Sequence, residues 1–485
     1  MNKRNREMSL FAIAAAALAI IWVVLASAPK SSAIPAFSRK YQTSCTTCHN
    51  NYPELNDFGE AFKKNGFKFP KDDDTFVKEP PVMLGSKAQK EAFPNAVYPG
   101  EIPGYLPIAF RYEGNFTMNR ARPAGFIAQN GFTPRTDLFT PNTFTIISAG
   151  SFGDNLSFWI DDDISVGAAN ANGGMGDGWL KYSDLGRKLG LPKNSLNVRF
   201  GQFELDIPFT QAKSIYLSPY DVYSEANVAG SLGTANNPVI FGSPQRGIEF
   251  GGTPNNGNFN WSLAVTNGSN VGTATRSSKD VYFRVSQKFN LERDAESRNA
   301  IQAAGATGPR DHTSVRLGFF YYYGKNQQNQ DGTLFAGIGT IEEPFYRTGV
   351  DIRFRYRNLE AFGLGMFGHD DNHTVTGIPA VLNIAPAAKF SGGFAGLNYW
   401  VHPWLIGTFH YDAVNSRADF LNGTPASQYQ TRNRFSPGFQ VLVRANIKVV
   451  GEYQYTFGQP YTATGTTNTL YFRPNTFVSG IDYVF

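Results

Sequence analysis

The chain has 485 residues and a formal net charge of +5, and only 17% of its residues are charged. The charge gives no argument for nucleic-acid binding, because the chain beyond residue 33 carries only +2 (40 basic and 38 acidic residues). Glycine is abundant at 49 residues and aromatic residues reach 14%, a composition typical of many β-strands joined by Gly- and Asn-rich turns.

Residues 1–33 have the layout of a secretory signal peptide. Basic residues precede the apolar run 10–25 and small residues follow it, so cleavage is expected after Ala33, with Ile34 as the mature N-terminus. An uncleaved anchor is the alternative, but sixteen apolar residues fall just short of the usual membrane span. Both alternatives predict export. No later stretch has the length of a transmembrane helix.

The only two cysteines of the chain lie in the sequence SCTTCHN, residues 44–50. Cys45, Cys48 and His49 match the attachment pattern of c-type haem. Two thiols three positions apart can bond the two vinyl groups of one porphyrin, and the adjacent imidazole can bind the iron as its proximal ligand. The pattern therefore predicts one covalent haem c with His49 as an iron ligand.

A zinc site, a redox dithiol and a disulfide each fit this motif less well. A structural zinc site needs a second pair of ligands nearby, and the next histidine is His312. A redox dithiol would accompany a βαβ unit, which the sequence does not indicate. A disulfide between Cys45 and Cys48 would close a short, strained loop and would leave His49 without a role.

A short helix is expected directly after the motif, over residues 51–66. Pro53 would lie in its first turn, and Gly66 is a natural C-terminal stop. Three apolar residues with helical spacing would form the face that packs on the haem: Leu55, Phe58 and Phe62.

The sixth iron ligand is less well defined by the sequence. Between residues 34 and 105 there is no second histidine, and Met83 is the only thioether. Met83 is therefore the candidate distal ligand and would give a high-potential, electron-transferring iron, although a methionine there could equally fill a packing gap. Met118 is the second candidate. An open sixth position would instead favour ligand binding or peroxidase-like chemistry.

The pattern changes from an irregular linker to alternation near residue 105. Residues 70–104 are rich in Pro, Lys, Asp and Glu. Residues 349–358 then place apolar side chains on one face and charged ones on the other, and residues 280–289 repeat this alternation. Segments of this kind are typical of transmembrane β-barrels, although a soluble β-sandwich also alternates.

Sixteen strands are expected, joined by connections that tend to alternate between long and short, as in outer-membrane barrels. The expected strands lie near residues 106–118, 142–152, 156–165, 177–184, 196–205, 246–252, 258–266, 279–289, 313–324, 345–357, 359–369, 391–400, 402–413, 437–446, 447–457 and 475–485. The long connections, expected as outer loops, lie near 119–141, 166–176, 206–245, 325–344, 370–390, 414–436 and 458–474. The charged segment 290–312 breaks the rule, because it is long where a short turn is due.

The C-terminus gives a more specific indication. The last strand alternates up to a terminal aromatic residue, Phe485, as outer-membrane barrels commonly do. A soluble protein seldom ends on an exposed Phe in mid-strand, because that leaves an apolar edge. The sequence therefore predicts a mostly β fold, a transmembrane antiparallel barrel of about 16 strands with a small helical N-terminal domain. A lumen of this size is wide enough to be aqueous or to hold a plug.

The chain resembles the fused monohaem cytochrome–porin proteins of bacterial outer membranes, whose best-studied members are iron oxidases. The dense part of the resemblance is carried by Pro35, Phe37, Arg39, Cys45, Cys48, His49, Pro53, Leu55, Phe58, Gly59, Phe62, Gly66 and Phe67. Elsewhere the likeness concerns architecture, with porin-like stretches at 198–209 and 261–268. It implies a signal peptide over 1–33, a monohaem cytochrome domain with its linker over 34–104, and a porin-like barrel over 105–485.

The resemblance also implies a function. A cytochrome held at or within the lumen of a plugged barrel would take electrons from an extracellular donor, Fe(II) in iron-oxidising members, and pass them to a periplasmic cytochrome c. Ser38 stands where those members usually carry Ala, and Asn56-Asp57 where they usually carry Thr-Pro. These differences leave haem attachment untouched and bear on the identity of the donor.

Polar residues in the barrel suggest one further site. Four potential ligands of Fe(II) fall in an expected outer loop, although ordinary polar loop residues are the commoner case: His369, Asp370, Asp371 and His373. Asp161 and Asp163 are expected to face the lumen as pore lining. A solute porin with a structural or sensing haem, and a peroxidase-like haem enzyme, are the alternative functions.

Overall fold

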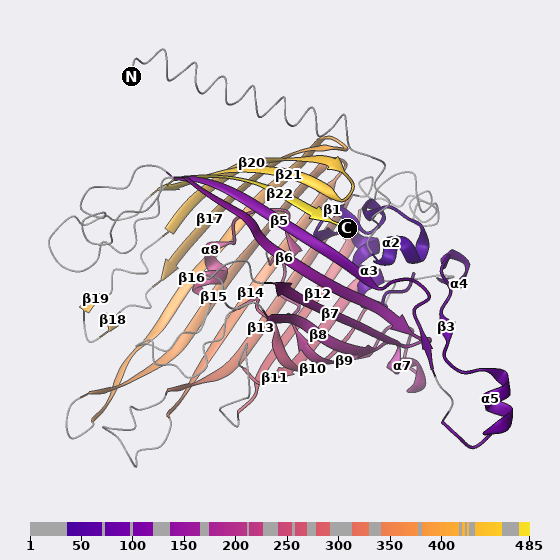
Figure 1. Cartoon of the computed structure of the whole chain (residues 1–485). Helices are drawn as coiled ribbons and strands as arrows, with labels where there is room; N and C mark the ends of the chain where they lie inside the picture. The colour runs from indigo at the N-terminus through magenta and orange to yellow at the C-terminus, as the bar shows by residue number, and fades with distance from the viewer. Residues whose placement is uncertain are drawn as a thin grey trace.

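The computed structural model describes residues 36–69, 73–97, 100–119, 136–164, 174–210, 213–226, 241–254, 258–268, 278–291, 313–328, 341–376, 381–416, 420–421, 424–425, 432–457 and 475–485. The expected signal peptide, the segment 292–312 and parts of the long connections lie outside these ranges. The described chain forms a large barrel with a small N-terminal unit at one end (Figure 1).

Sixteen antiparallel strands close into a barrel, which confirms this part of the predicted fold. Successive strands pair with each other around the barrel, and the small pair β18 (Phe420–Leu421) and β19 (Thr424–Pro425) lies outside it. The barrel strands are β5 (Ile108–Asn119), β6 (Thr136–Phe152), β7 (Leu156–Ile164), β8 (Gly174–Tyr182), β9 (Asn197–Phe203), β10 (Gln245–Gly252), β11 (Phe259–Thr266), β12 (Asp280–Asn290), β13 (Ser314–Gln328), β14 (Ile341–Tyr356), β15 (Leu359–Thr376), β16 (Val381–His402), β17 (Leu405–Ser416), β20 (Arg432–Arg444), β21 (Ile447–Phe457) and β22 (Thr476–Val484).

Two irregular features of the strand pattern are resolved by the pairing. Strands β12 and β13 pair directly, from Val281 opposite Tyr323 to Asn290 opposite Ser314, so the long segment between them disturbs no register. Strands β15 and β16 continue through much of the expected loop 370–390, because their backbone ladder extends to Thr376 opposite Val381. This part of the chain is a long hairpin instead of an irregular loop.

The first and last barrel strands close the sheet through the terminal aromatic residue. Strand β22 pairs with β5. The backbone N–H of Phe485 donates to the carbonyl of Phe110 at 2.8 Å, and the N–H of Phe110 donates to the carbonyl of Phe485 at 2.7 Å. The terminal Phe is thus a paired residue, since closure leaves the sheet no free edge.

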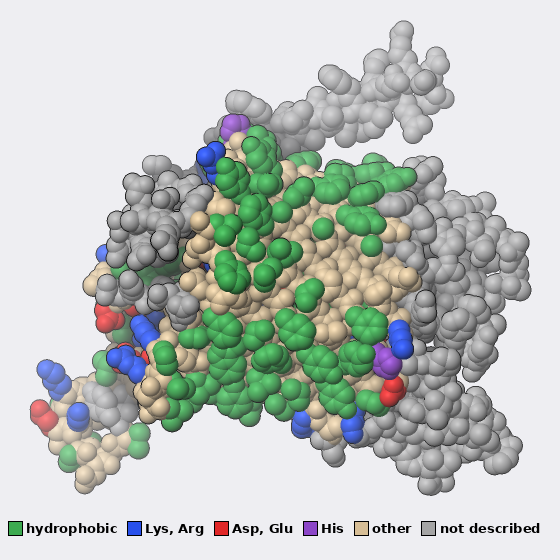
Figure 2. All heavy atoms as spheres, turned by 180° about the vertical axis from the view of Figure 1, so that it is seen from behind, with side chains coloured by type: hydrophobic (Ala, Val, Ile, Leu, Met, Phe, Trp, Pro, Cys, Tyr) green, Lys and Arg blue, Asp and Glu red, His purple; other side chains and the backbone are tan. Residues whose placement is uncertain are grey.

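The outside of the barrel is apolar. In β14, Val350 and Ile352 are 60% and 46% exposed, whereas the intervening Asp351 is only 6% exposed. Figure 2 shows apolar side chains spread over the face formed by the strands, with charged residues confined to its margins. Exposed aromatic residues gather toward both ends of the strands, at Tyr321, Tyr323, Tyr453 and Tyr455 on one side and at Tyr356, Tyr399 and Trp404 on the other.

The N-terminal unit consists of short elements. They are α2 (Ala36–Tyr41), the 3-10 turn η1 (Cys45–Thr47), β1 (His49–Asn51), β2 (Glu54–Leu55) and α3 (Asp57–Lys64), followed by α4 (Asp73–Phe76), β3 (Val82–Met83), α5 (Lys87–Ala92) and β4 (Glu101–Ile102). One more short helix, α7 (Leu185–Lys188), precedes β9. Within the described ranges, no helix is both long and apolar enough to cross a membrane.

The helix expected over 51–66 is shorter than predicted. Residues 49–55 form the β1–β2 hairpin, with Pro53 in its turn, and α3 begins only at Asp57. The reason is local: the Asn56 side chain accepts a hydrogen bond from the backbone N–H of Gly59 at 2.8 Å and so caps the helix. The predicted stop is confirmed, since Gly66 has a φ of +71° just beyond the helix end.

The connection after β9 folds into the lumen, where an outer loop was expected. It contains α8 (Asp221–Glu225), which packs on β16 and β17. Leu205, Ile207 and Val222 are at most 1% exposed. Burial of each such side chain stabilises the folded state by about 1.5–3 kcal/mol, and this stabilisation would be absent if the segment were an exposed outer loop. The described residues 204–210 and 213–226 therefore fill the middle of the barrel.

Candidate cofactor cavity

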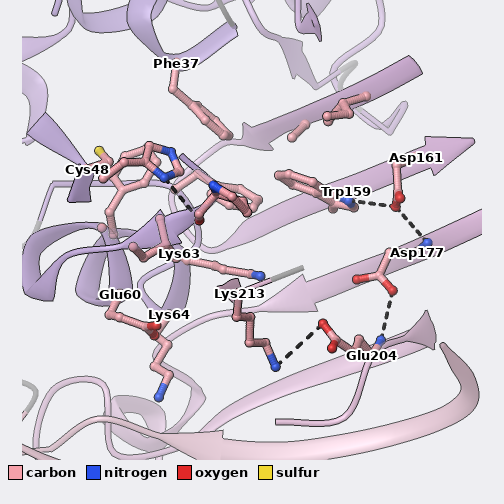
Figure 3. A pocket seen from close by; sticks show the side chains of 18 of the residues that line it. Phe37, Cys48, Glu60, Lys63, Lys64, Trp159, Asp161, Asp177, Glu204 and Lys213 are labelled. Atoms are coloured by element: carbon pink, nitrogen blue, oxygen red, sulfur yellow. Dashed lines mark hydrogen bonds and ion pairs between the residues drawn. The ribbon is translucent and has the colours of Figure 1, made fainter. Parts of the chain in front are cut away.

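A cavity of about 530 Å³ lies between the N-terminal unit and the barrel wall. Cys45, Cys48 and His49 all line it, together with residues of strands β5 to β11. Its volume falls in the range of small-molecule and cofactor sites, roughly 300–1,000 Å³. Figure 3 shows Phe37, Cys48, Lys63 and Trp159 around this space.

The two cysteines are brought together by a tight turn. Ser44 caps η1 by accepting a hydrogen bond from the N–H of Thr46, and the N–H of Cys48 donates to the carbonyl of Cys45 at 3.1 Å. Both thiols are free and half-buried. The turn therefore presents two thiols and the next imidazole to one space.

The His49 ring is oriented by the hairpin that follows it. Its Nδ1 lies 3.3 Å from the carbonyl oxygen of Pro53, to which the ring N–H donates, so Nε2 keeps its lone pair. Burial lowers the pKa of the imidazole to about 4. His49 is consequently neutral at pH 7, the form that binds a metal.

Helix α3 and its N-cap residue pack against the turn that carries the two cysteines. The backbone N–H of Asn56 donates to the carbonyl of Cys48 at 2.9 Å, and the Asn56 side chain donates to the carbonyl of Thr47 at 3.0 Å. A Cβ on Gly59 would lie 2.0 Å from the Cys48 carbonyl oxygen. The close approach of helix and turn therefore requires glycine at this position.

Gly59→Ala is expected to destabilise the N-terminal unit by about 1–3 kcal/mol, because the helix must move away from the turn that carries Cys45 and Cys48. The thermal midpoint of the unit and the haem content per protein should both fall. Gly100→Ala is the matched control, since a Cβ there would meet nothing within 4 Å. Equal behaviour of the two variants would show that the close contact is unimportant.

Aromatic rings form the apolar wall of the cavity. Phe37 stacks on Phe67 at a centroid distance of 4.7 Å, and Phe67 lies 5.8 Å from the Trp179 ring. Phe62 and Trp179 are each 4% exposed. The sequence predicted Phe62 as a residue of this wall but did not predict Trp159 and Trp179. The alternation of β7 and β8 could have indicated them, because both tryptophans lie on the lumen face of these strands.

A row of carboxylates lines the cavity on the barrel side. Asp161 accepts from the indole N–H of Trp159 at 2.9 Å and from the backbone N–H of Asp177 at 2.7 Å. Asp177 in turn accepts from the backbone N–H of Glu204 at 2.8 Å (Figure 3). Asp163 also lines the cavity. The prediction that Asp161 and Asp163 face the lumen is therefore confirmed.

Ion pairs bind β2 and α3 of the N-terminal unit to the inner face of the barrel wall. The carboxylate of Asp57 lies 2.5 Å from the Lys288 ammonium, and that of Glu54 lies 3.3 Å from the Arg355 guanidinium. On strand β8, the Lys181 ammonium donates to the carbonyl of Lys64 at 2.7 Å. These contacts bind the unit to three strands of the barrel wall, β8, β12 and β14.

Both candidate distal ligands lie away from the cavity. Met83 belongs to the two-residue strand β3, pairs with Glu101 and is 52% exposed. Met118 is 47% exposed on strand β5. Neither lines the cavity that holds His49.

The three described side chains of the four considered for an Fe(II) site do not converge on one point. Asp370 is bound by the buried Arg347 at 2.9 Å, whereas the His369 ring stacks on Tyr346 at 5.2 Å. Asp371 accepts from His369 at 3.0 Å, and the side chain of His373 lies outside the described part. Among the described residues, no group of three or more His, Cys, Asp or Glu side chains is placed to hold a metal ion.

The residues of the cavity fit a c-type haem. Two free thiols and a neutral imidazole face one space, as covalent attachment and proximal ligation require. The aromatic wall suits the apolar faces of a porphyrin. Cys45, Cys48 and His49 would hold the group.

Comparison with known proteins finds similarity only to the backbone fold of solved structures. No protein-family model matches the chain, and no curated protein matches it. Solved structures that match include an anion-selective porin from Comamonas acidovorans (TM-score 0.49, 13% identity, 78% of this chain and 98% of that chain). Salmonella typhi OmpF in complex with daunomycin gives a TM-score of 0.47 at 12% identity, over 79% and 98% of the two chains. TM-scores and identities this low say nothing about function. The barrel is assigned from its strand pairing alone.

Proposed function

We propose that this protein is an electron conduit of the bacterial outer membrane, an Fe(II):cytochrome c oxidoreductase. The observation that carries the proposal is the position of Cys45, Cys48 and His49, which line one cavity inside an apolar-coated barrel. A covalently held redox group there would lie within an insulating bilayer, where an electron needs a carrier.

The exterior of the barrel supports the membrane location. Exposed apolar residues with aromatic residues toward both ends are typical of outer-membrane barrels. The N-terminal unit contacts residues at the short turns, as in the ion pair of Lys68 with Asp154 at 3.5 Å. Short turns face the periplasm in such barrels, so we place the unit at the periplasmic end.

The proposed role of the chain is to hold and shield the redox group. A bound haem c would supply a one-electron couple. The thiols of Cys45 and Cys48 fix its position, and the Pro53 carbonyl keeps the His49 ring oriented. The aromatic wall excludes water, which lowers the local dielectric constant and so strengthens the influence of nearby charges on the couple.

Two observations support Fe(II) as the donor. One is the resemblance of the N-terminal segment to iron-oxidising cytochrome–porins. The other is the carboxylate row, since Asp161 and Asp163 lie on β7 on its way from the short turn 153–155 toward the opposite end of the barrel. Carboxylates raise the local concentration of cations. One Fe(II) would lose one electron to become Fe(III), and one periplasmic cytochrome c would gain it.

A solute porin with a structural or sensing haem is the second candidate. The packing of residues 204–210 and 213–226, and of β2 and α3, inside the lumen favours the conduit, because these parts obstruct a path for solutes. Conductance in a planar bilayer separates the two: large, stable steps would support the porin, and their absence would support the conduit.

Fe(II) is expected to reduce the oxidised, detergent-held protein rapidly and stoichiometrically. Anaerobic stopped-flow spectroscopy would follow the α-band of the reduced c-type haem. Reduction by dithionite with no reduction by Fe(II) would contradict the proposed donor while leaving the haem site and the barrel intact. Asp161→Asn is the matched variant for the carboxylate row, and we expect slower reduction by Fe(II) but no slowing with dithionite, which is an anion.

A further inference from the structure

The described lining of the cavity contains one imidazole, that of His49, and no thioether. The other described methionines are placed elsewhere. Met83, Met118 and Met175 are about half exposed, and Met366 is buried in strand β15. None of their sulfur atoms lines the space that the thiols and His49 share.

The other described histidine side chains are also engaged elsewhere. His369 stacks on Tyr346 at 5.2 Å, and His402 stacks on Trp404 at 5.4 Å, both away from the cavity. His410 is fully buried, with Nδ1 at 2.7 Å from Asp412 and Nε2 at 3.1 Å from the Ser218 hydroxyl. Both nitrogens of His410 are thus bonded in the lumen, so this ring has no lone pair to offer.

The cavity instead contains a cationic side chain. The Lys63 ammonium lies 5.9 Å from the centre of the Trp159 ring and reaches across the space in Figure 3. In the described part of the chain it forms no ion pair within 4 Å, whereas its neighbour Lys64 lies 3.9 Å from Asp206. An ammonium donates hydrogen bonds but has no lone pair for a metal.

We propose that the haem in this cavity has an exchangeable distal position, at which small anions such as azide and cyanide bind with the help of the Lys63 charge. The proposal rests on the haem site proposed above. It follows from the described residues that line the cavity: His49 would be the one strong iron ligand among them, since they include no second imidazole and no thioether. Polarity and access on the distal side then decide which ligands bind.

The test uses the full-length, haem-loaded protein in detergent at pH 7. The ferric protein is expected to show a high-spin spectrum by absorption and electron paramagnetic resonance. Azide titration should convert it to a low-spin form with one ligand per haem. The Met83→Ala protein should give the same spectra and the same affinity, because Met83 lies outside the cavity.

Lys63→Gln tests the role of the charge. Loss of one positive charge from a partly buried site should weaken azide binding by roughly tenfold. Carbon monoxide is neutral, so its affinity for the reduced protein should stay within about twofold in the same variant. A protein whose azide and carbon monoxide affinities changed equally would contradict the role given to Lys63.

Two spectroscopic outcomes would overturn the proposal. A low-spin ferric haem with a methionine-to-iron charge-transfer band that disappears in Met83→Ala would make Met83 the sixth ligand. A low-spin haem that becomes high-spin in Lys63→Gln would make the lysine amine that ligand. Failure of the proposed function looks different: a haem that binds azide but is not reduced by Fe(II) would refute only the conduit. A chain without covalent haem would refute both.

Discussion

Replacing Cys45 and Cys48 together with Ser is expected to abolish covalent haem while leaving the barrel folded. The thiols supply both thioether bonds, whereas the turn that carries them is held by backbone groups, such as the Cys48 carbonyl that accepts from Asn56. Serine preserves these contacts. Haem staining after denaturing electrophoresis should disappear, and the β-sheet signal in circular dichroism should remain.

The controls for this experiment lie in the same turn. Thr46→Ser changes an exposed residue between the cysteines and should leave haem attachment unaffected. The single variants Cys45→Ser and Cys48→Ser should each keep at most one thioether. Full covalent haem in the double variant would show that the motif does not attach it.

Asp57→Asn is expected to loosen the N-terminal unit from the barrel. The carboxylate lies 2.5 Å from Lys288, 3.4 Å from Arg355 and 3.6 Å from Arg316, so the amide would leave three cations facing one another. Fully buried charges that lose a partner cost about 3–5 kcal/mol, and the 27% exposure of Asp57 reduces this to about 2–3 kcal/mol. Bilayer conductance should rise, and trypsin should cut after Lys63 or Lys64 more readily.

The same contact predicts a dependence on pH. Burial alone would raise the pKa of Asp57, but the nearby cations, Arg355 first, outweigh it and hold this pKa well below its usual range. A lowered folded-state pKa stabilises docking at pH values above the usual Asp pKa, about 3.9, and this stability is lost as the pH falls through the folded-state value. The difference between the wild type and Asp57→Asn should therefore be full at pH 7 and shrink in strong acid.

Glu91→Gln is the matched control, since Glu91 is an exposed acidic residue on helix α5 of the same N-terminal region. It should leave both conductance and proteolysis unchanged. Identical conductance in wild-type, Glu91→Gln and Asp57→Asn proteins would mean that other contacts hold the unit without Asp57.

The strands were largely predictable because their signal is local. In β14 the alternation of Val350 and Ile352 with Asp351 reports which face meets the apolar exterior, whatever the neighbouring strands are. The end of α3 was predictable for the same reason, since Gly66 stops the helix by its own backbone conformation. The start of α3 was missed, because the cap at Asn56 competes with the helical period of Leu55 and decides the boundary.

The sequence by itself determined the Cys45–Cys48–His49 motif and the closed sixteen-strand barrel, because both depend on spacing along the chain. Only the tertiary structure decided what surrounds the motif. It folded residues 204–210 and 213–226 inward, brought Trp179 against the N-terminal unit and left Met83 on the exposed two-residue strand β3. These outcomes depend on contacts between residues far apart in sequence, where burial and ion pairing select one arrangement and no local period records it.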